Sequence, residues 1–133
     1  MIFSARTGLT AKPDNNREQP MTRYLISFDD GAMTFPAEEL PDVARASMAV
    51  VEEARAAGVW VFGGGVIGQG AKVVSTDGSV ADYALGEGTL GGFSIVDVSS
   101  LDEALVWAGR IAVSCRCAQK VRELMADPDL TKS

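Results

Sequence analysis

Glycine is concentrated in one stretch of the chain, and this concentration restricts the possible folds more than any other feature. Eleven of the fourteen glycines lie between Gly58 and Gly92. A glycine inside a helix costs about 1 kcal/mol relative to alanine, whereas sharp turns and close backbone contacts favour it. We therefore expect strands joined by turns between these positions, with helices on either side.

Within this stretch, "VWVFGGGVIG" (residues 59–68) has the G-x-G-x-x-G spacing of a dinucleotide-binding loop. That loop works because its last glycine opens a helix whose N-terminal amides hold the pyrophosphate. Here the next residues are "QGAKVVSTDG", in which a further glycine, a Val-Val pair and an Asp-Gly turn signal oppose a helix. We therefore predict a β-hairpin, no NAD site and no cofactor.

Apolar periodicity predicts two helices. The first covers residues 40–57 and ends at Gly58, and the second covers residues 99–112 and begins with the capping box Ser100-x-x-Glu103. Buried stripes are expected at Leu40, Val43, Ala44, Met48, Val51, Ala54 and Ala57, and at Leu101, Ala104, Leu105, Ala108, Ile111 and Ala112, with Trp107 off the stripe. Strands are expected at residues 22–28, 59–64, 71–76, 91–98 and 115–124.

The element order β-α-β-(β)-β-α-β is typical of an α+β protein with the ferredoxin-like βαββαβ pattern, an antiparallel sheet with both helices on one face. In the strand at 91–98, Phe93 and Ile95 share one face, and Val96 and Val98 belong to the other. A single layer of helices leaves one sheet face bare. With 47% hydrophobic residues, we expect a second copy to cover it, sheet against sheet, in a homodimer.

The chain is expected to form a single domain over residues 21–125. The polar, aperiodic residues 1–20 are interpreted as a disordered leader and residues 126–133 as a flexible tail. Neither a signal peptide nor an apolar run long enough for a membrane span is present. These features predict a cytoplasmic protein that makes no membrane contact.

Charge argues against nucleic acid as a partner. The net charge is −6, and the stretch from Tyr24 to Gly109 holds thirteen acidic residues against three basic ones. Binding to nucleic acid depends on neutralising phosphates with Lys and Arg, so this acidic body would repel a phosphate backbone. The predicted partners are a second copy of the chain and a small-molecule ligand.

The chain contains no histidine, and its two cysteines are Cys115 and Cys117. This composition excludes His-based acid–base chemistry, Ser-His or Cys-His nucleophile pairs and histidine-ligated metal. Two cysteines at i, i+2 cannot complete a zinc site, and we interpret them as ordinary buried thiols. No metal site is expected.

One combination of motifs is more specific than any of these features. The stretch "TDGSVADYALGEGTLGGFSIVDVSSLDEALVWAGR", together with the opening "MTRYLISFDD" and the junction "ARAAGVWVFGGGVI", resembles the DGPF branch of the YCII-related family over roughly residues 21–124. The resemblance implies a ferredoxin-like fold that forms a dimeric α/β barrel with a cleft in each subunit. Better-studied members are associated with a His-Asp pair, which a chain without histidine lacks, so the resemblance leaves open whether this protein is an enzyme.

Carboxylates are the candidate catalytic groups. Asp30, next to Asp29 at the end of the first strand, could act as a base, or both could initiate a turn. Asp77 could anchor a ligand at the family-matching position, or head the turn. Glu87 could serve as a further catalytic carboxylate, or belong with Asp82 to a solvated acidic loop. Together Asp77, Asp82 and Glu87 offer a weak alternative site for Mg²⁺ or Ca²⁺.

Aromatic side chains are the candidate ligand-binding residues. Phe28, Trp60, Phe62 and Tyr83 are expected to line the cleft, although Trp60, Phe62 and Phe93 also suit a core or a dimer interface. The function predicted first is a homodimer with a small-molecule-binding cleft. The alternatives are an enzyme that acts on a small aromatic or lactone-like compound by carboxylate chemistry, and a stress-associated or regulatory interaction scaffold.

Overall fold

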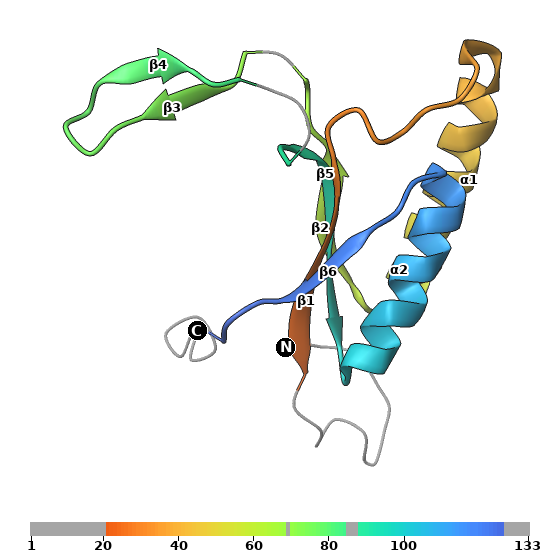
Figure 1. Cartoon of the computed structure of the whole chain (residues 1–133). Coiled ribbons are helices and arrows are strands. Elements are labelled where there is room, and N and C mark those ends of the chain that lie inside the picture. Colours follow the sequence, from red (N-terminus) through yellow and green to blue (C-terminus); the bar gives the residue numbers. More distant parts are fainter. Residues whose placement is uncertain (1–20, 69, 85–87, 127–133) are drawn as a thin grey trace.

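The computed structural model (Figure 1) describes residues 21–68, 70–84 and 88–126 of the chain. It is a mixed α+β structure with a four-stranded antiparallel sheet, a separate two-stranded sheet and two helices. The elements are β1 (Thr22–Asp29), the 3-10 turn η2 (Ala37–Glu39), α1 (Leu40–Ala56), β2 (Trp60–Gly65), β3 (Lys72–Val74), β4 (Val80–Asp82), β5 (Leu90–Val98), α2 (Leu101–Cys115) and β6 (Lys120–Glu123).

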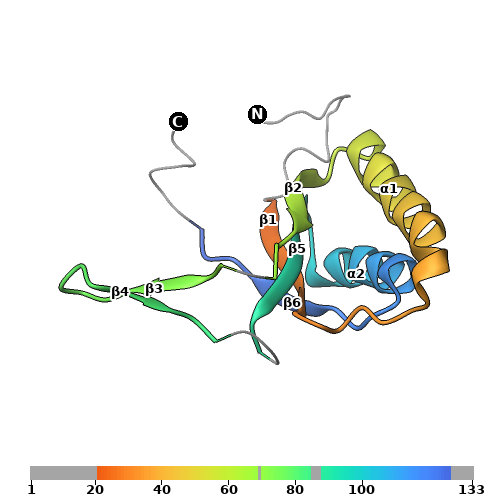
Figure 2. The same cartoon turned by 90° about the horizontal axis from the view of Figure 1, so that it is seen from above.

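The main sheet has the order β2-β5-β1-β6, with every neighbouring pair antiparallel. The strand that precedes α1 and the strand that precedes α2 are therefore central, and the strands that follow the helices form the edges. Both helices lie on the same side of this sheet when it is viewed from above (Figure 2). The arrangement is compatible with the predicted ferredoxin-like α+β fold.

The core lies between the sheet and the helices. Ile26 of β1 and Val96 and Val98 of β5 are completely buried, and they contact Trp107 and Ile111 of α2 within one cluster. The predicted alternation along β5 is confirmed, because Val96 and Val98 face the helices. Burying side chains of this size contributes about 1.5–3 kcal/mol each, so this side of the sheet holds the domain together.

The first helix keeps its predicted limits, but only part of its predicted buried face is buried. It is followed, as expected, by Gly58, whose φ is 77°. Val43 and Ala54 are buried, whereas Leu40 and Met48 are more than half exposed. The reason is that α1 contacts mainly α2 and meets the sheet mainly at β2, so only a narrow part of its surface is covered.

The second helix begins as predicted, because the Ser100 hydroxyl accepts a hydrogen bond from the Glu103 amide at 3.1 Å. Its buried residues are Ala104, Trp107, Ala108, Ile111 and Ser114. The predicted stripe was wrong at Leu101 and Leu105, which are about half exposed. The buried face is rotated toward Trp107 because burying an indole ring removes more apolar surface from water than burying a leucine.

The last strand is shorter than predicted. Helix α2 continues to Cys115 and ends at Arg116, whose φ of 60° is left-handed, and β6 begins only at Lys120. The prediction of a strand from residue 115 was therefore wrong over its first half. Cys115 and Cys117 are free and partly buried.

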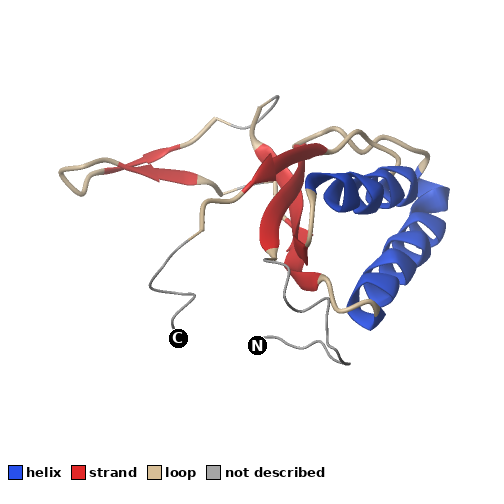
Figure 3. Cartoon of the chain, turned by 90° about the horizontal axis from the view of Figure 1, so that it is seen from below, coloured by secondary structure: helices blue, strands red, loops and turns tan. Residues whose placement is uncertain are grey.

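The glycine-rich stretch forms strands and a hairpin, as predicted, and the described residues between Gly68 and β5 contain no helix. Strand β4, which the sequence analysis did not identify, pairs with β3 in register Val74↔Val80. The turn between them places Gly78 at a φ of 89°. This hairpin projects from the sheet on the side opposite the helices (Figure 3).

Candidate functional site

The face of the main sheet opposite the helices is uncovered within the described residues (Figure 3). Antiparallel partners place their side chains on the same face, so the register identifies what this face carries. One row across the sheet holds Arg122, Leu25, Ile95 and Phe62, and the next holds Lys120, Ser27, Phe93 and Gly64. We refer to these eight residues as the open face.

The centre of the open face is apolar. Phe62 is 61% exposed, and its ring centroid lies 5.9 Å from that of Phe93 with the rings tilted by 52°. Leu25 and Ile95, which share a row with Phe62, are half-buried. An exposed aromatic ring that continues an apolar row from the central strands is typical of a surface that another molecule covers.

One edge of the open face is basic. The Lys120 ammonium lies 2.8 and 3.1 Å from the two Asp29 carboxylate oxygens, and its hydrogen bond lowers the pKa of Asp29 below its ordinary value. Arg122 donates to the Ser27 hydroxyl at 3.5 Å, and Ser27 is only 3% exposed. Among the described residues Arg122 makes no direct ion pair with a carboxylate, although its charge also contributes to lowering the Asp29 pKa.

The four aromatic residues predicted to line a cleft do not come together. Phe28 and Trp60 lie on the helix side of the sheet, where a Cβ at Gly92 would collide with the Phe28 ring and one at Gly63 would lie 2.8 Å from the Trp60 indole. Phe62 points to the opposite face. Tyr83 lies at the base of the β3–β4 hairpin, where its amide donates to the Ala71 carbonyl at 3.0 Å.

The structure also separates the predicted carboxylates. Asp30 follows β1 at one end of the main sheet, and its amide donates to the Thr89 carbonyl at 2.8 Å. Asp77 lies in the turn of the projecting hairpin, where a hydrogen bond from the Ser79 amide at 2.9 Å lowers its pKa. Glu87 lies outside the described residues. No acid–base pair is formed between Asp30 and Asp77.

The weak alternative of a Mg²⁺ or Ca²⁺ site gains no support from the described residues. Asp77 is in the hairpin turn, and Asp82 ends β4, where Lys72 lies 2.5 Å from its carboxylate. Across residues 21–68, 70–84 and 88–126, no three side chains of the metal-ligating types gather. The third member of the predicted set, Glu87, is not among these residues.

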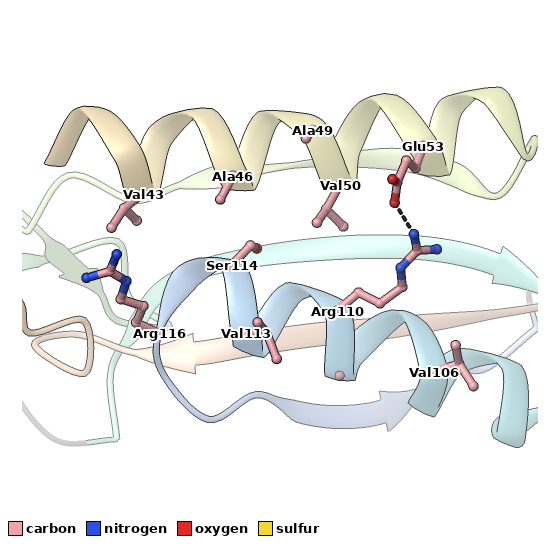
Figure 4. Close-up of a pocket in the computed structure, with 11 residues that line it drawn as sticks. Val43, Ala46, Ala49, Val50, Glu53, Val106, Arg110, Val113, Ser114 and Arg116 are labelled. Atoms are coloured by element: carbon pink, nitrogen blue, oxygen red, sulfur yellow. Dashed lines mark hydrogen bonds and ion pairs between the residues drawn. The ribbon is translucent and has the colours of Figure 1, made fainter. Parts of the chain in front are cut away.

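A groove between α1 and α2 was not anticipated from the sequence (Figure 4). It occupies about 690 Å³ on the outer surface of the helices, and Val50 and Val113 line it together with small residues such as Ala46 and Gly109. Its most prominent polar group is an ion pair between Glu53 of α1 and Arg110 of α2. The exposed valines of α2, which lie off the predicted stripe, were the signal in the sequence.

The basic groups of this groove are already neutralised. Arg110 pairs with Glu53 and lies 4.7 Å from the Trp107 ring centroid. Arg116 pairs with Glu39. The two arginines therefore join elements of the same chain, which leaves the groove without a free cation for a ligand.

The cysteines offer no reactive centre. Burial raises the pKa of the Cys117 thiol, which disfavours the thiolate that reacts as a nucleophile. The Cys115 sulfur lies 3.4 Å from the Ser47 hydroxyl on α1. Cys115 also packs against the core cluster, so its role in the described residues is structural.

Among the surfaces of the described residues, the composition of the open face is therefore the most typical of a binding surface. No helix among the described residues has the length and apolarity to cross a membrane. No family model matches the chain, and no curated protein matches it. The assignment of function accordingly starts from the geometry of the open face.

Proposed function

We propose that the protein is a homodimer whose subunits join through their open faces and bind a small molecule in a cleft between them. The observation that carries the proposal is the aromatic contact between the exposed Phe62 of edge strand β2 and the partly buried Phe93 of central strand β5, on a sheet face that no helix of the described residues covers. The resemblance to YCII-related proteins implies the same dimeric α/β barrel.

The energetics favour this contact. Covering Phe62 would contribute about 1.5–3 kcal/mol, and a two-fold axis doubles every contact because the same surface contributes from both subunits. Stable complexes bury roughly 800 Å² per partner around such aromatic centres. A sheet packed on a sheet provides two flat, complementary apolar layers about 10 Å apart.

The composition of the face supports a binding role. Small-molecule sites are mostly apolar and contain a few well-placed polar groups. Here the Arg122 guanidinium, which also donates to the buried Ser27 hydroxyl, lies in one of the apolar rows. Binding fits the geometry better than carboxylate catalysis, because Asp30 and Asp77 are separated.

Native mass spectrometry and sedimentation equilibrium test this proposal. The wild type should have the mass of two chains, and any mass lost on denaturation would identify the ligand. Phe62→Glu should weaken the dimer at least about a hundredfold, because two copies of an apolar contact are lost. Val113→Glu, an equally polar change at an 81% exposed position on α2, should leave the dimer unchanged.

Two results would contradict the proposal. A monomeric wild type would remove the dimer altogether. A dimer that survives Phe62→Glu but dissociates on Val113→Glu would place the contact at the helical groove instead.

A further inference from the structure

The β3–β4 hairpin projects from the same side of the sheet as the open face, and the views agree on this (Figures 1 and 3). Its two strands pair only with each other and form a sheet separate from the main one. An isolated two-stranded hairpin is at best marginally stable in water. A hairpin held away from its own domain therefore needs a covering surface.

The side chains of the hairpin also indicate that another molecule covers it. Val74 and Val80 are cross-strand partners on one face, and they are 65% and 63% exposed. Val73 and Tyr83 are also exposed. Exposed apolar residues that are grouped on a projecting element, rather than scattered singly, are typical of an interaction surface.

The open face alone is small for the interface of a stable dimer, so a second copy of the chain needs a further contact surface. Four strands about 4.8 Å apart and about 20 Å long give a sheet face of roughly 400 Å² in plan. This is less than the roughly 800 Å² that each partner buries in a stable complex. In a two-fold dimer each subunit would add its hairpin to the contact, which extends the interface beyond the sheets.

Charge indicates where the hairpin would lie. Its turn carries the Asp77 carboxylate, which accepts a hydrogen bond from the Ser79 amide and is held in place by it. The basic edge of the open face carries Arg122, which makes no direct ion pair among the described residues, although its charge, with that of Lys120, acts on Asp29. In a chain with a net charge of −6, two cations that share one carboxylate beside an apolar face are a specific complement for an acidic turn.

We propose that the β3–β4 hairpin is an arm that crosses to the second subunit, covers the edge of its open face and brings Asp77 to the partner subunit's Arg122. The arm closes one side of the cleft between the sheets, so the ligand site is incomplete in a single chain. This inference rests on the proposed homodimer and specifies which segment completes its site.

A charge-exchange cycle tests the arm, with the dimer dissociation constant measured by sedimentation equilibrium. Asp77→Lys and Arg122→Glu should each weaken the dimer about two- to five-fold, and the double variant should recover most of the loss because the pair is restored with its signs reversed. Asp77→Asn is the matched control for the turn, since its side-chain oxygen still accepts the Ser79 hydrogen bond. It should weaken the dimer by a similar or smaller factor than Asp77→Lys.

The apolar part of the arm has its own test. Val74→Ser combined with Val80→Ser should weaken the dimer more than tenfold, because both side chains would be covered by the partner. The folded domain should keep its circular dichroism spectrum and its thermal midpoint within a few degrees, because the hairpin does not pair with the main sheet. An unchanged dissociation constant would show that the hairpin does not lie on the second subunit.

The outcomes separate this inference from the proposed function. If Phe62→Glu dissociates the dimer while the arm variants leave it intact, the sheet-to-sheet dimer stands and the arm is refuted. If the two single charge changes weaken the dimer and the double variant weakens it further, the contact between Asp77 and Arg122 is refuted. A monomeric wild type would refute both proposals.

Discussion

Gly63 is a position at which a single added methyl group should destabilise the sheet. It lies in β2 opposite Ser94 of β5. A Cβ built there would lie 2.5 Å from the Phe93 carbonyl oxygen, 2.9 Å from the Ser94 Cα and 2.8 Å from the Trp60 indole. Two of these three atoms belong to the backbone of the neighbouring strand, so they cannot move aside as a side chain would. Gly63→Ala therefore forces β2 and β5 apart or displaces Trp60.

The magnitude follows from the cost of overpacking. An extra methylene in a well-packed region costs about 1–3 kcal/mol, and we expect at least the middle of that range because backbone atoms are involved. A loss of about 2 kcal/mol lowers the thermal midpoint by roughly 8–16 °C in a domain of this size. The change is large compared with the 0.5 kcal/mol that most surface substitutions cause.

Urea unfolding followed by circular dichroism at one protein concentration measures the difference. Gly65→Ala is the matched control, because it lies in the same strand and a Cβ there would meet no atom within 4 Å. The control should stay within about 0.5 kcal/mol of the wild type. If Gly63→Ala unfolds at the same urea concentration as the control, the close approach of β5 to Gly63 of the paired strand β2 is wrong.

Two further predictions concern the cap of α2 and the ion pair of β6. Ser100→Ala should lower the free energy of unfolding by about 1 kcal/mol, and Ser100→Asp should restore it, because the side-chain oxygen of either Ser or Asp accepts a hydrogen bond from the Glu103 amide. Urea unfolding measures both variants, and equal stability of the wild type and the two variants would contradict the role of Ser100 as a cap. Lys120→Met should make stability less sensitive to acid. The Asp29 pKa is lowered in the folded state, so its contribution is present above the ordinary value of 3.8 and is lost as the pH falls through the folded pKa. Unfolding free energies at pH 7 and pH 3 should therefore differ less in this variant than in the wild type, and an equal difference would show that the pair does not form.

The sequence was most informative where a pattern has one physical solution. Alternating apolar residues in β5 specified the buried face, because a strand side chain can point only up or down. Ser100 with Glu103 marked the start of α2, and Gly58 marked the end of α1, because few residues satisfy those termini. These positions depend on local chemistry alone.

The sequence was least informative where the structure of a segment depends on which other element packs against it. Each helix buries only part of its predicted stripe, and α2 also buries Trp107, which was expected to lie off it. Helix α1 contacts mainly α2 rather than the sheet, and periodicity cannot show which partner a helix meets. Strand β4 was missed because three residues are too few for a pattern. The aromatic cleft failed for a related reason. A bulge between Trp60 and Phe62 shifts the register, so local sequence alone could not show which of the two rings faces the helices.

The two described candidate carboxylates, Asp30 and Asp77, lie on different parts of the subunit. Asp30 is held at one end of the main sheet, and Asp77 lies on a hairpin that projects away from it. Within one subunit the two groups cannot act on one substrate. If the hairpin crosses to the second subunit, however, Asp77 enters the neighbourhood of a different chain's open face, where Arg122 would keep it ionised. In that arrangement a polar ligand contact that uses Asp77 would exist only in the dimer, and it should disappear, together with ligand binding, when Phe62→Glu separates the subunits.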